Sequence, residues 1–590
     1  MSASVAGVGM RLIRTGLIAL AATALAACGG GGGSGGDGVG IPPITPTNSN
    51  IAALTVNQTF TGPAATANNE FNLTSGSTVN GSGAADTLSV SYDASAKSYT
   101  VAVAGRTQTF APADVVATAT GETRFQKDGA AGKDRLTLVT TPYSSQTSNR
   151  YVGMGIWQRS NTVGDRQNDQ LATFVYGLNT PAAAMPRAGR ANFAIDVFGM
   201  STVPGFEPSV LQGLGNFDVD FMAGVFSTQT YLTETGLVTG SGVSGGGIEL
   251  IGAGTLSSTE PRFSGNVTAG SRNAKLTGSL SGLFYGPGAE EIGASFSATN
   301  SDGASFTGSF TGQRGAGPAV NLTLTDMVAS QLFYVSGISL EVYPVQGFNY
   351  QVRTSRLIGQ LQDRTSGNFS YGPGSSDMAG GEFTVNSIVS SSDPNFTTYE
   401  KTFGDRKVRL ELFKIGAANT QLALTYSTLG RWQSAAPFGV GSKSQYHHFV
   451  YGLETPERLL TTRTGSARYE GVAYGAGANA VSGVEYDVRG TSVFNVDFSG
   501  QTYSGDLTLN GRSSVGTVDF GRYDFAGRLS STGKTSSANL TSGGAAAGDI
   551  ITRFYGPTGE EIGGDFEIFV PESVQSGQTR ISGVTIARRR

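Results

Sequence analysis

Cysteine, histidine and tryptophan are almost absent from this chain of 590 residues, which has one Cys, two His and two Trp. A single cysteine excludes an internal disulfide and a thiolate metal site. The two histidines, His447 and His448, are adjacent, so on a strand they point to opposite faces. Because no further His or Cys stands near them, we expect neither a metal site nor a bound cofactor.

Charge is also scarce, since charged residues make up 14% of the chain and the formal net charge is −4. This balance argues against a nucleic-acid or anionic-membrane surface. No nucleophile elbow, phosphate-binding loop or dinucleotide fingerprint stands in a strand-to-helix context, so we expect no enzyme and no catalytic residue. Hydrophobic residues, at 38%, nevertheless suffice for packed cores.

Strand patterns dominate what is present. Phe217, Val219 and Phe221 fall on one face of a strand, and Asp218 and Asp220 fall on the other. The lobes contain no convincing amphipathic helix of three turns, and the strand runs are separated by short Gly-, Ser- and Asn-rich turns. This organisation predicts an antiparallel all-β architecture.

The amino terminus predicts a lipid anchor. Arg11 and Arg14 precede a short apolar run, which ends in Leu25-Ala-Ala-Cys28. The run is too short to span a bilayer and has a small-residue cleavage site, so residues 1–27 read as a lipoprotein signal peptide. Cys28 would carry the lipid, and the Gly- and Pro-rich segment 28–50 would act as a tether. The alternative is an ordinary cleaved signal peptide that leaves a free thiol.

The chain is an internal duplication. Residues 284–296 (FYGPGAEEIGASF) recur as residues 554–566 (FYGPTGEEIGGDF), and the FVYGL-T-P block at 174–181 recurs at 449–456. The two tryptophans, Trp157 and Trp432, occupy one equivalent position. We expect this duplicated tryptophan to lie in a barrel core.

The order of the repeated blocks resembles the barrel domains of the transferrin-binding protein B family of surface lipoproteins. The resemblance rests on Pro186-x-x-Gly189-x-Ala191-x-Phe193, on Val219-Asp220-Phe221 and above all on the closing phrase. The second copy has Thr462 in place of the turn proline, and the first has Gly293-Ala294 where the family has Gly-Gly. The motif residues, expected to be structural, are Phe284, Tyr285, Gly286, Pro287, Glu291 and Gly293, and in the second copy Phe554, Tyr555, Gly556, Pro557, Glu561, Gly563 and Gly564.

The resemblance implies two tandem lobes, each a small handle sheet followed by an antiparallel eight-stranded β-barrel. We place the handles at residues 51–149 and 316–424 and the barrels at 150–315 and 425–590. The implied role is that of a lipid-anchored protein on the bacterial outer membrane, at the cell surface. Such a protein binds an extracellular solute or an iron-carrying protein as the partner of a TonB-dependent outer-membrane receptor. The ligand itself stays open.

Paired glutamates in the closing phrase, Glu290-Glu291 and Glu560-Glu561, have the residue type of a glycosidase site. Neighbours on a strand point to opposite faces, so one pair cannot flank a scissile bond. We therefore expect turn carboxylates that bond backbone amides.

The sequence also leaves other functions open. The same scaffold could serve as an adhesin or an immune-evasion binder. An integral outer-membrane β-barrel would share the Gly-rich, cysteine-poor composition, although the lipobox and the end at Arg588-Arg589-Arg590 oppose it. An extracellular hydrolase lacks a credible site.

The stretch Ser201–Leu214 is our candidate for ligand contact. It contains Phe206 and Leu211, whereas the second copy has mostly small residues around Ala476–Val484. Loops at the mouth of a rigid barrel can vary without disturbing its core, which favours recognition. The alternative is that Phe206 and Leu211 pack the loop onto its own barrel.

The lipid anchor gives the first testable prediction. Replacing Cys28 by Ala removes the sulfur that would carry the lipid, so the variant should leave the membrane fraction. Metabolic labelling with a fatty-acid analogue should mark the wild-type chain only. Labelling of the Cys28→Ala variant would contradict the assignment.

Overall fold

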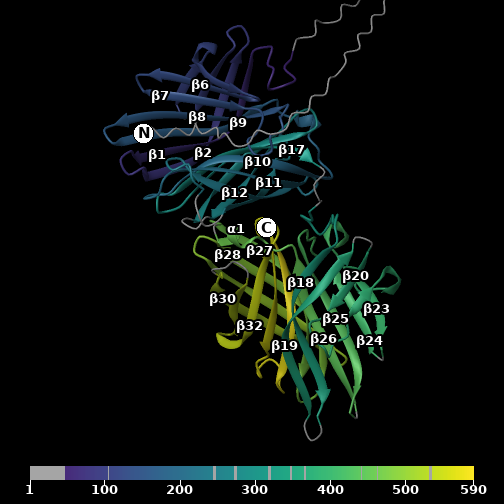
Figure 1. Ribbon diagram of the computed structural model, residues 1–590. Coiled ribbons are helices and arrows are strands. Elements are labelled where there is room, and N and C mark those ends of the chain that lie inside the picture. The colour runs from purple at the N-terminus through teal and green to yellow at the C-terminus, as the bar shows by residue number, and fades with distance from the viewer. Residues whose placement is uncertain are drawn as a thin grey trace, which may run out of the picture.

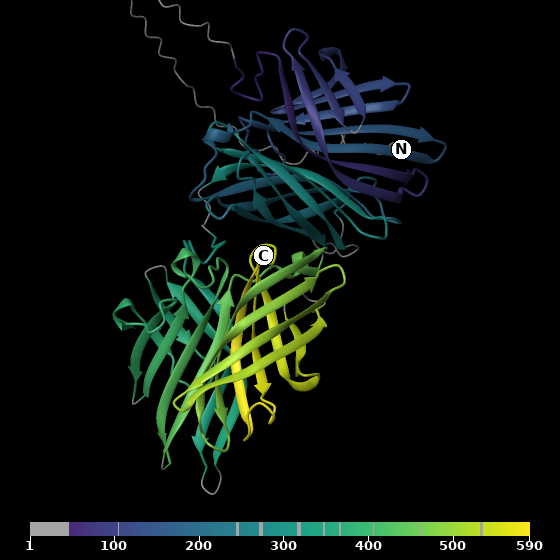
Figure 2. The ribbon, with the colours of Figure 1, turned by 180° about the vertical axis from the view of Figure 1, so that it is seen from behind.

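The computed structural model describes residues 47–590, apart from 104, 243–246, 271–274, 316–319, 346–348, 365–366, 405, 440, 462 and 531–534. It has two lobes that lie end to end, and each lobe consists of a β-sheet beside a closed β-barrel (Figures 1 and 2). The all-β, two-lobe prediction is confirmed, although each sheet has nine strands and is not small. Cys28, the signal peptide and nearly all of the expected tether lie outside the described residues.

The N-lobe sheet has the strand order β4-β3-β2-β1-β9-β8-β7-β6-β5, and all its neighbouring strands are antiparallel. Its strands are β1 (Gln58–Asn72), β2 (Ser77–Asp93), β3 (Ser98–Val103), β4 (Arg106–Phe110), β5 (Val115–Ala119), β6 (Glu122–Gly129), β7 (Gly132–Val139), β8 (Val152–Val163) and β9 (Arg166–Gly177).

The N-lobe barrel runs in chain order and closes by pairing its first strand with its last. Its strands are β10 (Arg190–Thr202), β11 (Ser209–Asp220), β12 (Val225–Gly236), β13 (Ile248–Leu256), β14 (Arg262–Gly270), β15 (Lys275–Tyr285), β16 (Glu291–Thr299) and β17 (Ser305–Gly315).

The C-lobe repeats this plan, with the sheet order β21-β20-β19-β18-β26-β25-β24-β23-β22. The sheet strands are β18 (Gln331–Pro344), β19 (Tyr350–Arg364), β20 (Asn368–Gly372), β21 (Gly381–Phe383), β22 (Ile388–Val389), β23 (Phe396–Phe403), β24 (Arg406–Phe413), β25 (Ser427–Phe438) and β26 (Gly441–Gly452). A short helix, α1 (Glu457–Thr461), leads into the second barrel. The barrel strands are β27 (Ser466–Asn479), β28 (Glu485–Asp497), β29 (Thr502–Ser513), β30 (Gly516–Arg528), β31 (Ser536–Ser542), β32 (Ala545–Tyr555), β33 (Glu561–Phe569) and β34 (Thr579–Arg589).

The expected boundary between sheet and barrel is wrong in both lobes. The hairpin β8–β9, which we had placed in the barrel that starts at 150, lies in the sheet between β1 and β7, and β25–β26 do the same in the C-lobe. Much of β8 and β9 is buried on both faces, with the sheet's own core on one side and the barrel on the other. Such strands lose the alternation that would assign them to one layer.

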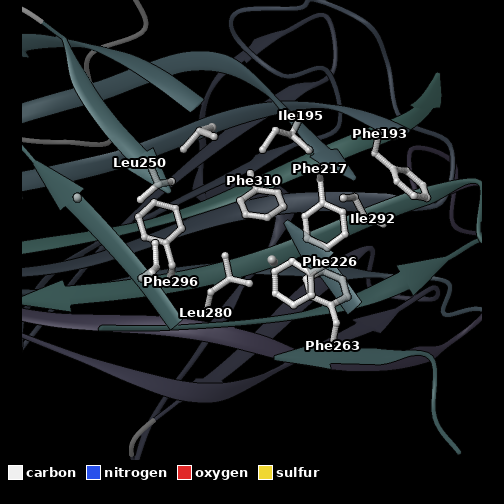
Figure 3. Close-up of a cluster of buried hydrophobic side chains, with 14 of the residues drawn as sticks. Phe193, Ile195, Phe217, Phe226, Leu250, Phe263, Leu280, Ile292, Phe296 and Phe310 are labelled. Carbon is white, nitrogen blue, oxygen red and sulfur yellow. The ribbon is translucent and has the colours of Figure 1, made fainter. Parts of the chain in front are cut away.

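Aromatic side chains fill the barrels. In the N-lobe barrel Phe217 stacks on Phe226 with ring centroids 4.8 Å apart, and Phe263 and Phe310 close the cluster (Figure 3). Phe217 and Val219, expected on one strand face, are both buried in this core. Phe221 is buried there too, although β11 ends at Asp220. The barrel is therefore a packed core and leaves no wide lumen.

The outer face of the C-lobe barrel is polar. On β30 the buried Tyr523 and Phe525 alternate with the exposed Arg522 and Asp524, which form an ion pair with an N–O distance of 2.8 Å. A membrane-embedded barrel has the opposite arrangement, with its apolar side chains outward. This pattern opposes the integral-membrane reading of the sequence.

The lobes meet at the end of the first barrel. Arg190 donates to Asp326 at 3.1 Å and pairs with Asp220 at 3.2 Å, while Val225 packs with Tyr426 and Tyr555 of the C-lobe. The carboxyl terminus lies near this joint (Figure 1). Among the described residues, every sheet and barrel is built from strands of a single lobe.

Because each lobe closes its own sheet and barrel, a fragment of residues 316–590 should fold alone. We expect a single cooperative thermal transition for the fragment, monitored by circular dichroism. A fragment without a transition, beside a full mature chain that melts cooperatively, would contradict the independence of the lobes.

Candidate functional site

The closing phrase joins the barrel to the sheet. Phe284 points into the barrel core, whereas the next residue, Tyr285, packs on the other side against Val152 and Val175 of the sheet. The connection that leaves the sheet also pairs here, because Thr180 N–H donates to the Phe284 carbonyl and Gly286 N–H donates to the Leu178 carbonyl.

Glu291 connects the barrel to the sheet at this joint. Its carboxylate accepts three backbone N–H groups at the start of β8, from Arg150 at 2.8 Å, Tyr151 at 2.8 Å and Val152 at 3.0 Å. A buried barrel carboxylate thus satisfies three consecutive amides of the sheet. We call this arrangement the carboxylate–amide clamp.

The C-lobe builds the same clamp from Glu561. Thr425, Tyr426 and Ser427 donate their backbone N–H groups at 2.6, 3.1 and 2.8 Å, and the Ser427 hydroxyl adds a fourth bond at 2.7 Å. Burial raises the pKa of Glu561 to about 7, although the four donors act in the opposite sense. Burial also raises the pKa of Glu291.

The preceding glutamates, Glu290 and Glu560, form hydrogen bonds within their own turns. Glu290 accepts the N–H of Gly288 at 2.8 Å within its own turn, and Glu560 does the same for Thr558 at 2.9 Å. The backbone of Gly286, with φ of +85°, lies in the region that favours glycine, and a Cβ there would collide with Glu290 and Tyr151. The paired glutamates therefore hold turns and strands together in both lobes.

The candidate contact stretch Ser201–Leu214 is mostly strand. β10 continues to Thr202 and β11 begins at Ser209, so only residues 203–208 form a turn. Leu211 is 0% exposed and lies in the barrel core, which removes it from any binding surface. Phe206, by contrast, is 52% exposed. Leu211 was wrongly assigned to a loop. The sequence alone does not show whether an apolar residue near a turn lies in the loop or on the inward face of the next strand.

Three turns converge around Phe206, and we call this surface the N-lobe tip. The Phe206 carbonyl accepts the N–H of Thr78 from the β1–β2 hairpin at 2.7 Å. Glu207 accepts the N–H groups of Val238 and Thr239, each at 3.0 Å, from the turn after β12. Besides Phe206, the exposed apolar residues of the tip are Val79 and Val238. The equivalent C-lobe turn, 480–484, exposes the smaller Val481.

Both tryptophans lie in the sheets, so the barrel-core prediction is wrong. Trp157 is fully buried, donates its indole N–H to Asp134 at 2.9 Å and lies under the guanidinium of Arg106. Trp432 donates to the Ala379 carbonyl at 3.0 Å. They complete the sheet core on the face away from the barrel.

The two histidines are buried in the C-lobe sheet and face opposite ways. His447 Nδ1 shares a hydrogen bond of 2.6 Å with the Tyr371 hydroxyl, and burial lowers the pKa of His447 to about 3. His448 faces the barrel and lines a polar cleft between β24–β26 and β27–β28. In the described part of the chain, no group of three or more His, Cys, Asp or Glu side chains could hold a metal ion.

This cleft was not predicted from the sequence. It has a volume of about 270 Å³, and its charged lining residues are Arg409, Glu411, Arg431, Glu485, Asp487 and Arg489. Arg431 is the central group, because it pairs with Glu411 of the sheet at 2.5 Å and with Asp487 of the barrel at 3.3 Å.

Comparison with known proteins identifies the barrels. The family model of the C-lobe and N-lobe beta barrels of Tf-binding protein B matches residues 254–314 and 462–589, one segment in each barrel. Both barrels thus resemble those of transferrin-binding protein B, and the similarity rests on these two matched segments. A search of the curated proteins finds no match.

Solved structures similar to this chain include three transferrin-binding proteins B. A double mutant from Haemophilus parasuis is 15% identical, covers 77% of this chain and 85% of its own, and has a TM-score of 0.27. The isotype 1 protein from serogroup B Neisseria meningitidis is 17% identical, with 77% and 89% covered and a TM-score of 0.26. Intact Ap-TbpB is 15% identical, with 75% and 84% covered and a TM-score of 0.26.

No helix among the described residues combines the length and the apolar character needed to cross a membrane.

Replacing an acceptor oxygen of the clamp should destabilise the C-lobe. In Glu561→Gln, an NH₂ group replaces an oxygen that faces N–H donors, so we expect a loss of about 1–3 kcal/mol in the free energy of unfolding. Glu560→Gln is the control, since the side chain of Glu560 accepts from Thr558 within its own turn. Denaturant unfolding of both variants measures the difference; equal losses would contradict the clamp's importance.

The raised pKa of Glu561 predicts that the stability of the C-lobe depends on pH. The pKa of Glu561 is raised from 4.5 to about 7 in the folded chain, so the folded state binds the proton more tightly than the unfolded state. The contribution of Glu561 to stability is fully present below about pH 4.5 and is lost as the pH rises through 7. The stability gap between wild type and Glu561→Gln should therefore narrow from pH 5 to pH 8; a widening gap would contradict the raised pKa.

Proposed function

We propose that this chain is an outer-membrane surface lipoprotein that captures an extracellular solute or an iron-carrying protein. It passes this ligand to a TonB-dependent outer-membrane receptor. The observation that carries the proposal is the match of both barrels to the transferrin-binding protein B barrel family. The lipobox that ends at Cys28 supports attachment to the membrane, because an acylated cysteine with a flexible tether lets both lobes move above the surface.

The N-lobe tip is the capture surface in this proposal. Phe206, Val79 and Val238 expose apolar area on turns that are tied to each other by backbone and Glu207 hydrogen bonds. An exposed apolar group on a rigid support costs little entropy to bury, which favours a protein ligand. The packed barrel interiors leave the surface as the place for recognition.

An adhesin or immune-evasion role would use the same tip without a receptor. The two functions are separated by the partner in the membrane. Immobilised mature protein, incubated with solubilised outer membranes of the source bacterium, should retain a TonB-dependent receptor that mass spectrometry identifies. Adjacent genes for the two proteins would agree with this result. Failure to retain any such receptor would overturn the uptake function and favour adhesion.

Substitution of Phe206 tests the capture surface. Phe206→Ala should weaken capture of the ligand about tenfold or more, since apolar anchors at an interface cost 2 kcal/mol or more when truncated. The melting temperature should hardly change, because the side chain is half exposed. The matched control is Phe438→Ala, a similarly exposed phenylalanine in a C-lobe hairpin.

The ligand for this measurement is the protein or solute that the wild-type chain retains from the extracellular medium, identified before the variants are compared. Unchanged affinity of Phe206→Ala would exclude the tip. An equal loss in Phe438→Ala would show that neither site is specific.

A further inference from the structure

The polar cleft of the C-lobe lies where the N-lobe has a packed apolar interface. In the N-lobe, one row of paired strand residues facing the barrel reads Thr137–Ile156–Thr173. The equivalent row of the C-lobe reads Glu411–Arg431–His448. The two rows are equivalent because a tryptophan of the repeat directly follows the middle residue of each row. The N-lobe row is thus uncharged, whereas all three residues of the C-lobe row are ionisable.

The facing barrel strands differ in the same way. The cross-strand pair Met200–Val210 of the N-lobe corresponds to Ala476–Asp487 of the C-lobe, since each pair follows the conserved aromatic–glycine step of the first barrel strand. In the N-lobe Met200 and Val210 pack with Ile156 against the sheet in one hydrophobic cluster. Replacing methionine by alanine removes volume, and replacing valine by aspartate adds charge.

The charges of the cleft are fixed in place. Arg431 lies over the ring of Phe396 with its guanidinium carbon 4.4 Å from the centroid, and it pairs with Glu411 and Asp487. Arg489 pairs with Asp393 at 2.9 Å and with Asp487 at 3.1 Å. Ion pairs across an interface hold a geometry but replace packing that would stabilise the lobe at least as well. Stability alone therefore does not explain them.

Three groups at the cleft have bonding capacity left over. His448 is 4% exposed, and its Nδ1 has no hydrogen-bond partner among the described residues. The buried Nε–H of Arg431 also has none. Glu485 accepts from the hydroxyls of Ser444 and Tyr446, but no described cation pairs with its carboxylate. The carboxylate of Glu485 therefore remains able to pair with a cation in the cleft.

These free groups define the chemistry of a ligand. The guanidinium groups that line the cleft can donate to an acceptor such as a carboxylate, and the carboxylate of Glu485 can pair with a cation such as an ammonium group. The lining contains three arginines and three carboxylates, so the charges balance and the cleft favours neither an anionic nor a cationic ligand. A volume of about 270 Å³ is near the lower end of ligand pockets, about 300–1,000 Å³, and suits a solute of amino-acid size.

We propose that the cleft between the sheet and the barrel of the C-lobe binds a free amino acid or a similar small zwitterion. The carboxylate of the ligand accepts from Arg431, and its ammonium group pairs with Glu485. The imidazole of His448 closes the inner wall of the cleft. This site is separate from the N-lobe tip and does not depend on the function proposed for that surface.

Calorimetric titration of the mature full-length chain with each standard amino acid tests the proposal. Succinate and cadaverine, which carry two like charges each, are the controls for charge type. At least one amino acid should bind, and neither control should bind. Binding of succinate or cadaverine with equal affinity would overturn the zwitterion, and absence of binding by every amino acid would overturn the site.

Two variants locate the binding. Glu485→Gln keeps the size of the side chain but removes its charge, so binding should weaken about 10–100-fold, the effect of one charged hydrogen bond. Ala476→Met introduces the residue that stands at this position in the N-lobe, Met200, and fills the cleft. Asp519→Asn is the matched control, because it removes one exposed carboxylate of the same barrel on β30. Unchanged affinity in both cleft variants, or an equal loss in the control, would overturn the assignment.

A measurement on the unmodified chain does not depend on how the variants fold. The chain has two histidines, so ¹⁵N-histidine labelling gives two imidazoles to follow by NMR. The bound amino acid should shift the nitrogens of His448, while those of His447, which faces the other side and bonds Tyr371, should stay in place. Binding without a shift at His448 would place the ligand elsewhere and overturn the proposal.

Discussion

A buried carboxylate that accepts three consecutive backbone amides is the interaction on which each lobe depends. A closed barrel has no free strand edge with which to pair a sheet, so the two layers can only be joined through side chains and connections. Glu291 and Glu561 supply that joint from the first residue of a barrel strand to the start of a sheet strand. The clamp fixes position along the strand, because the donors are backbone groups of a defined register.

The rest of the interface then depends on small side chains. In β16 and β17 nearly every residue is buried on both faces, and Ser295 of the barrel donates to the Pro63 carbonyl of the sheet at 3.0 Å. A Cβ at Gly293 would lie 2.9 Å from Val152, so the two layers approach closely beside the clamp. Glycine, serine and alanine are frequent in β16 and β17, where their small side chains allow this close contact between the layers.

The sequence predicts the architecture through its repeat and its turn chemistry, and it fails where strands are buried twice. Phe217 and its neighbours alternate clearly and lie where they were expected. Strand β8, which carries Trp157, has no such alternation and was placed in the wrong layer. Leu211 was taken for a loop residue because the sequence does not show where β11 begins. The sequence predicted part of the N-lobe tip, namely Phe206. It did not predict the cleft, although one sign of it is that Arg431 of the second copy stands at the position of Ile156 in the first.

The duplication explains how one lobe could change while the other did not. Glu561 fixes the position of the sheet relative to the barrel, and the residues around position 431 take no part in this contact. Charged residues can therefore stand at these positions in the C-lobe while the sheet and the barrel keep the same relative position. A polar cleft in a single lobe would otherwise threaten the fold, since unpaired buried groups are costly. The two lobes thus share one structural joint, and their differences lie where the joint leaves freedom: in the exposed turns of the N-lobe and in the interface of the C-lobe.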